Sequence, residues 1–264
     1  MISCYRTVAF DDLNAFFREA GSADAPALLL LHGFPTSSHM FRELIPALAD
    51  RYRVVAPDLS GFGFTDAPYR TNFTYTFDHL TDVIERFTEV LSLDHYAIYI
   101  FDYGAPIGLR LAMRHPERIV AVISQNGNAY LEGLSEGWNP SQTYWKNPSE
   151  ENRAALRGFL TLKAIHTQYT FGCLLQKRLS PDAWTLDPAL LARPGNDEIQ
   201  LDLFGRLPEL SIQNSKNISE QDAPRATCRL RKERPVFRAC RRQSIRSGYS
   251  RYRSSSPGSR TFRA

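Results

Sequence analysis

Asp102 is the residue of this chain whose setting is best suited to chemistry. It follows the apolar strand expected over Tyr96–Ile100 and precedes the helix expected over Gly104–Arg114. A side chain at a sharp strand-to-helix turn is held exposed, and small residues such as Gly104 and Ala105 let the turn pack. A carboxylate there can attack carbon and form an ester. Taken alone, Asp102 could equally cap the helix; a second motif favours the nucleophile.

That second motif is His32-Gly-Phe-Pro35, which ends another predicted strand. Ligands of an open parallel sheet lie at the carboxyl ends of its strands, so both motifs are expected at one site. The backbone N–H groups of Phe34 and Tyr103 would then form an oxyanion hole. The positive end of the helix dipole points at the same place and favours a carboxylate.

A base for the second half of such a reaction is missing. Hydrolysis of an ester on Asp102 requires an activated water, and histidine is the usual base. The last histidine of the chain is His166, which we interpret as structural, and His32 is expected to hold its own loop. The sequence therefore predicts no histidine base. The four cysteines lie far apart, so it predicts no metal site, and no cofactor is expected.

The elements around these motifs alternate between strand and helix, which predicts an α/β fold with a mostly parallel sheet covered on both faces. Residues 1–128 form the expected core, and the aromatic-rich residues 129–200 an expected helical cap that could roof the site, or simply be further core. The predicted core strands and helices are Ser3–Phe10, Leu13–Arg18, Ala27–Leu31, Phe41–Leu48, Arg53–Ala56, Phe77–Leu91, Tyr96–Ile100, Gly104–Arg114 and Ile119–Ser124.

Residues 201–264 are expected to be a basic, disordered tail, so that the last strands of the sheet are missing or disordered. From Arg206 onward the chain has 15 Lys and Arg against 4 Asp and Glu, whereas the preceding residues have 17 against 24. The tail lacks aromatic interleaving, so we expect no nucleic-acid partner. Without a signal peptide or a long apolar run, we expect a cytoplasmic protein with no membrane partner.

The stretches HGFP, PDLSGFGFTDAP and FDYGAPIGLRLAMRHPER, together with the aromatic insert, resemble the α/β-hydrolase fold family, specifically its epoxide hydrolase and haloalkane dehalogenase branch. The resemblance covers about Phe10–Gly205, with Ile100 departing from the small residue usual before the turn. It implies a small hydrophobic substrate, an alkyl-enzyme ester on Asp102, and later hydrolysis by a His–acid pair.

The resemblance also implies substrate contacts from the cap. Epoxide hydrolases use cap tyrosines to donate a hydrogen bond to the epoxide oxygen, and Tyr144 and Tyr169, with Trp145 beside them, are the candidates. Dehalogenases grip halide with a Trp after the nucleophile, where this chain has Tyr103, so epoxide opening is favoured. A non-catalytic pseudo-hydrolase that binds a hydrophobic ligand remains the alternative. The oligomeric state is not predicted.

The tail behaves as the C-terminal segment that the resemblance implies, translated one nucleotide out of register. With allowed codons, Arg231–Arg238 can be re-read as Gly-Lys-Asn-Asp-Pro-Phe-Phe-Val, and Ser259–Arg263 as Pro-Gly-His-Phe-Ala. These are the acid and base motifs that the resemblance implies, in the implied order. We therefore hypothesise a one-base insertion near codon 206, which removes the base and impairs turnover.

Overall fold

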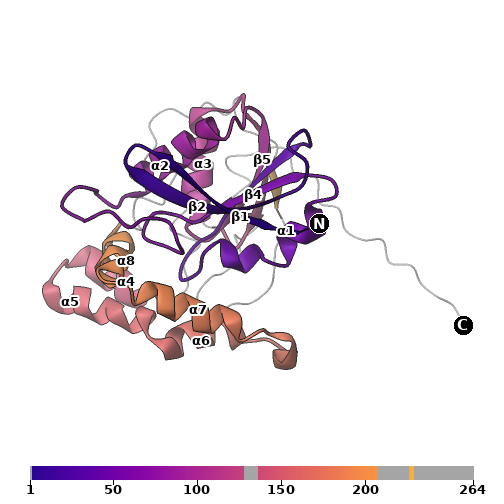
Figure 1. Cartoon of the computed structure of the whole chain (residues 1–264). Helices are drawn as coiled ribbons and strands as arrows, with labels where there is room; N and C mark the ends of the chain where they lie inside the picture. Colours follow the sequence, from indigo (N-terminus) through magenta and orange to yellow (C-terminus); the bar gives the residue numbers. More distant parts are fainter. Residues whose placement is uncertain (1, 128–135, 207–225, 229–264) are drawn as a thin grey trace, which may run out of the picture.

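The computed structural model describes residues 2–127, 136–206 and 226–228, and its centre is a seven-stranded sheet (Figure 1). The strand order is β1-β2-β4-β3-β5-β6-β7. The first hairpin and the β2–β4 pair are antiparallel, and the other pairs are parallel. The strands are β1 (Cys4–Phe10), β2 (Leu13–Ala20), β3 (Ala27–Leu31), β4 (Arg53–Pro57), β5 (Tyr96–Phe101), β6 (Ile119–Gln125) and β7 (Ala226–Cys228).

The apolar run of β3 is buried on both faces of this sheet. Leu29 and Leu31 face a core shared with helices α2 (Phe77–Val90) and α3 (Gly104–Arg114). Leu28 and Leu30 face the opposite core, which helix α1 (Leu44–Leu48) and the 3₁₀ helix η1 (Ser38–Phe41) cover. A central parallel strand has no solvent face, so alternation is absent from its sequence. The predicted mostly parallel α/β fold is confirmed.

One predicted core helix is divided in two. The sequence predicts a single helix over Phe41–Leu48, but η1 ends at Phe41 and α1 begins at Leu44. Pro46 explains the division, because proline has no N–H and is tolerated only in the first turn of a helix.

The chain after β6 contributes a separate layer of helices, α4 to α8, gathered on one side of the sheet (Figure 1). Helix α8 runs to Gly205, past the expected cap end at residue 200, and its Leu203 and Phe204 are buried. The elements are η3 (Glu136–Trp138), α4 (Asn139–Lys146), α5 (Glu150–Ala155), η4 (Leu156–Leu160), α6 (Leu162–Thr170), η5 (Gln176–Arg178), α7 (Asp182–Leu191) and α8 (Asn196–Gly205).

The expected tail falls mostly outside the described residues, and so do its re-read segments Arg231–Arg238 and Ser259–Arg263. Its described part beyond Arg206 is the short strand β7, which pairs with β6 in parallel and which the sequence did not predict. Throughout the described ranges, every helix is too short or too polar to cross a lipid bilayer.

Candidate active site

Asp102 lies at the turn between β5 and α3 with a left-handed backbone, φ 51°. Aspartate adopts this conformation more readily than most residues, although at some cost in strain. Its carbonyl oxygen accepts a hydrogen bond from the N–H of Ala105 at 2.9 Å, which closes the turn. Asp102 is 5% exposed, so its carboxylate lies in a buried turn.

Two backbone amides converge on one carboxylate oxygen of Asp102. The N–H of Phe34 and the N–H of Tyr103 each donate to Oδ1 at 2.7 Å. Charge-assisted bonds of this kind are roughly twice as strong as neutral ones. The structure thus brings together the three residues that the sequence placed at the nucleophile and the oxyanion hole.

Gly33 makes this convergence possible. A Cβ at this position would lie 2.3 Å from Cβ and from Oδ1 of Asp102, and 2.5 Å from the amide nitrogen of Tyr103. No side chain fits there. The loop after β3 can approach the turn after β5 only because residue 33 has no side chain.

His32 fixes that loop through hydrogen bonds at both of its ring nitrogens. Its Nε2 accepts the N–H of Leu59 at 3.0 Å, so Nδ1 carries the proton and donates to the carbonyl of Gly33 at 3.1 Å. Complete burial lowers the pKa of the imidazole, against an opposing effect of Asp58. With both ring nitrogens engaged, His32 has the structural role that the sequence suggested.

All six histidines of the chain lie within the described residues, and each has contacts of its own away from Asp102. His166 packs edge-on against Trp184, with ring centroids 5.1 Å apart. The others bond or approach backbone carbonyls and charged side chains; these are His39 with Arg18, His79 with Thr74, His95 with Glu117 and His115 with Glu85. The described residues therefore supply no imidazole positioned as a base for Asp102.

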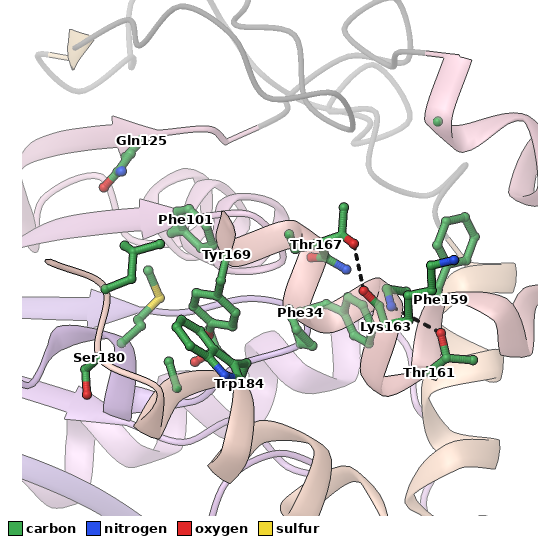
Figure 2. Close-up of a pocket in the computed structure, with 18 of the residues that line it drawn as sticks. Phe34, Phe101, Gln125, Phe159, Thr161, Lys163, Thr167, Tyr169, Ser180 and Trp184 are labelled. Carbon is green, nitrogen blue, oxygen red and sulfur yellow. Dashed lines mark hydrogen bonds between the residues drawn. The ribbon is translucent and has the colours of Figure 1, made fainter. Parts of the chain in front are cut away.

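A cavity of about 680 Å³ opens beside the turn, between the sheet and the cap (Figure 2). Asp102 is not in its wall, but Phe101 and Phe34, which flank Asp102 in sequence and in space, are. Figure 2 shows Tyr169 and Trp184 side by side, with Phe159 well apart from them. The exposed wall is mainly apolar, with Arg42, Lys163 and Arg178 among its polar residues, so the space suits a small, largely hydrophobic molecule.

The three cap residues expected at the substrate do not lie together. Tyr169 lines the cavity beside Asp102, whereas Tyr144 and Trp145 line a separate cavity of about 500 Å³ near Arg70. The indole N–H of Trp145 donates to the carbonyl of Phe204 at 2.8 Å. Of the expected cap contacts, only Tyr169 lines the cavity beside the turn at Asp102.

Asp187 is a buried acid near this cavity that the sequence did not predict. It lies on α7, is 1% exposed, and its Oδ2 accepts the hydroxyl of Tyr169 at 2.5 Å. Burial raises the pKa of its carboxyl to about 7. The aspartate before Pro188 gives no signal in sequence, because only the packing of α7 buries it.

Within residues 2–127, 136–206 and 226–228, no group of acidic, histidine or cysteine side chains could hold a metal ion. The site as described offers a carboxylate, two amide donors, a phenol and an apolar cavity. These groups can perform nucleophilic attack on carbon but lack an imidazole for water activation.

Known proteins resemble this chain in sequence and in fold. A family model described as the alpha/beta hydrolase fold matches residues 26–164. An uncharacterized hydrolase of Saccharomyces cerevisiae is 46% identical over 198 residues, which is 74% of this chain and 68% of that protein. A haloalkane dehalogenase of Mycobacterium marinum is 40% identical over 116 residues, which is 44% of this chain but only 39% of the dehalogenase.

Among solved structures, a candidate epoxide hydrolase of Pseudomonas aeruginosa superposes with a TM-score of 0.67 at 21% identity, covering 81% of this chain and 73% of that one. A haloalkane dehalogenase loop variant of Bradyrhizobium elkanii superposes with a TM-score of 0.59 at 22% identity, covering 78% and 70%. At these identities the superpositions establish a shared fold.

Proposed function

Because this chain belongs to the alpha/beta hydrolase fold family and is related in sequence to haloalkane dehalogenases, we propose that Asp102 is a nucleophile that attacks an sp³ carbon of a small hydrophobic epoxide or haloalkane. One observation carries the proposal. Oδ1 of Asp102 accepts two backbone N–H groups at 2.7 Å while the residue holds a left-handed φ. A helix cap has no need of this second donor from a distant loop.

In the proposed first step, Oδ2 of Asp102 forms a bond to the substrate carbon. The carbon–halogen or carbon–oxygen bond breaks, and its electron pair leaves with the halide or stays on the opened ring oxygen. The product is an ester of Asp102 whose carbonyl oxygen, Oδ1, already lies between the amides of Phe34 and Tyr103. Those amides would stabilise the oxyanion when water later attacks the ester.

The second step is proposed to be impaired. Water must lose a proton to attack the ester, and the described histidines are engaged elsewhere. Removing one member of a comparable catalytic triad costs roughly 10⁴-fold or more. We therefore propose that this polypeptide forms the ester and releases it very slowly.

Intact-mass spectrometry after exposure to styrene oxide or 1-bromohexane tests the first step. A gain of one substrate mass with styrene oxide, or of one hexyl group with 1-bromohexane, mapped to Asp102 and absent from Asp102→Asn, is expected. Asparagine tolerates the left-handed turn, so that variant keeps the fold. An adduct that survives in Asp102→Asn, or no adduct with either probe, contradicts the proposal.

The second candidate function is a non-catalytic protein that binds a hydrophobic ligand under the cap. The lack of a positioned base favours it, together with the apolar cavity of about 680 Å³. Stabilisation of the chain against heat by the same probes, without any gain of mass, would support this alternative.

A further inference from the structure

Asp187 lies between the cap and the loop that carries Phe34, and it lines a small cavity together with Thr36. It extends from α7 toward Thr36, two residues after Phe34, and the side chain of Thr36 contributes to lowering the carboxyl pKa. Its Oδ2 contacts the hydroxyl of Tyr169 on α6 at 2.5 Å. Thr36 and Tyr169 both line the large cavity, so Asp187 lies directly behind its wall.

The surroundings of Asp187 favour a neutral carboxyl. Burial is the largest influence and raises its pKa to about 7, and the negative charge of Asp58 acts in the same direction. The hydroxyls of Tyr169 and Thr36 and the guanidinium of Arg42 oppose this rise. Near neutral pH the group therefore holds a proton in a substantial fraction of molecules.

We propose that Asp187 is a positioning residue that supplies a proton through Tyr169 to the oxygen released when an epoxide opens at Asp102. This inference rests on the proposed function and deepens it, because it selects epoxides over haloalkanes as the substrate class. A released halide is stable without a proton, whereas an alkoxide is not, so only the epoxide needs the buried pair.

The proton balance of the step is complete. Asp102 bonds to the ring carbon, the carbon–oxygen bond breaks, and the ring oxygen takes the proton of the Tyr169 hydroxyl. Tyr169 takes the proton of Asp187 through their 2.5 Å contact, which leaves Asp187 as a carboxylate. When Asp187 is protonated, this contact runs from its O–H to the phenol oxygen and directs the phenol proton elsewhere.

Adduct formation with two probes tests the proposal on the chain as it is. We expect Asp187→Asn and Tyr169→Phe to slow the styrene oxide adduct by about 10²-fold, the scale of a general acid, and to change the 1-bromohexane adduct by less than about 2-fold. The ratio of the two rates in the unaltered chain should fall as pH rises through about 7. In Asp187→Asn the ratio should be flat. Asp24→Asn and Tyr69→Phe, at exposed positions, are the matched controls.

The outcomes separate the two proposals. If the unaltered chain forms no adduct with either probe, the proposed nucleophile fails before this inference is reached. If both adducts form and Asp187→Asn slows neither, or slows both equally, Asp187 has no role in proton supply. A rate ratio that stays constant with pH in the unaltered chain would likewise overturn the inference.

Discussion

The N–H of Phe34 donates to Oδ1 of Asp102 across 2.7 Å, although the two residues lie 68 positions apart. The bond joins the loop after β3 to the turn after β5, two strands that are neighbours in the sheet. Neither segment could hold the carboxylate alone, because each provides one amide. The pairing of β3 with β5 is thus what builds the anion site.

Gly33→Ala should remove this site. Its Cβ would lie 2.3 Å from the Asp102 side chain, with backbone on the other side, so the loop must move away. We expect loss of adduct formation and a decrease of about 2 kcal/mol or more in the free energy of unfolding, measured by urea denaturation. Gly158→Ala is the control for the free energy of unfolding alone, because a Cβ there meets nothing within 4 Å although Gly158 lines the cavity. Unchanged adduct formation in Gly33→Ala would contradict the described geometry.

Arg153 should contribute strongly to the docking of α8. Its side chain is 14% exposed and bonds Glu198 at 2.7 Å and Asp202 at 2.9 Å. Arg153→Ala removes the most buried of the arginines that bond Glu198 and Asp202 and leaves Arg157 and Arg70, so it should cost about 1–3 kcal/mol. Arg86→Ala, which loses exposed pairs with Glu89 and Asp11, should cost under about 0.5 kcal/mol. Equal decreases in the free energy of unfolding of the two variants would show that Arg153 stabilises α8 no more than an exposed ion pair would.

Asp187 should make the stability of the fold depend on pH. A carboxyl whose pKa rises from 3.8 to about 7 on folding binds more protons in the folded chain between those values. Its contribution to the free energy of unfolding is therefore present below about pH 4 and is lost as pH rises through about 7, by roughly 4 kcal/mol at most. Asp187→Asn should flatten this slope, so its stability relative to the unaltered chain should increase from pH 5 to pH 8. A difference that is constant with pH would contradict the buried, proton-holding carboxyl.

Sequencing the gene should reveal one extra base near codon 206. The shifted frame should encode Gly-Lys-Asn-Asp-Pro and then Gly-His-Phe, which restores an acid and a histidine base. Deleting the base should convert single adduct formation into turnover, raising product release by roughly 10⁴-fold. A shifted frame without Gly-His-Phe codons would refute the hypothesis, whatever the activity of the chain.

Much of the fold could be predicted because its signals are local. The apolar runs of β3 and β5 and the glycine after Tyr103 identify the strands and the turn at Asp102. Pairing by parallel strands then implies that Phe34 and Asp102 meet. The division of the Phe41–Leu48 helix also has a local cause, because Pro46 is tolerated only in the first turn of the second helix.

The cap could not be predicted to the same depth, because its residues are placed by packing between helices. Tyr144 and Tyr169 are indistinguishable in sequence, yet α4 directs one to the cavity near Arg70 and α6 directs the other to the cavity near Asp102. Asp187 gains its unusual carboxyl only when α7 buries it. Phe204 likewise contacts Phe34, at 5.0 Å between ring centroids, from a helix expected to belong partly to the tail.

Asp102 and the two amides that hold it all lie between residues 33 and 103, so the chain can form the proposed ester without the missing base. A molecule that bonds once to a reactive compound and keeps it is a consumable reagent rather than a catalyst. Its capacity would be counted in copies of the protein, one electrophile for each Asp102, and would be renewed only by synthesis. The number of intact Asp102 turns, each held by two 2.7 Å amide contacts, would then set the dose that a given amount of the protein can neutralise.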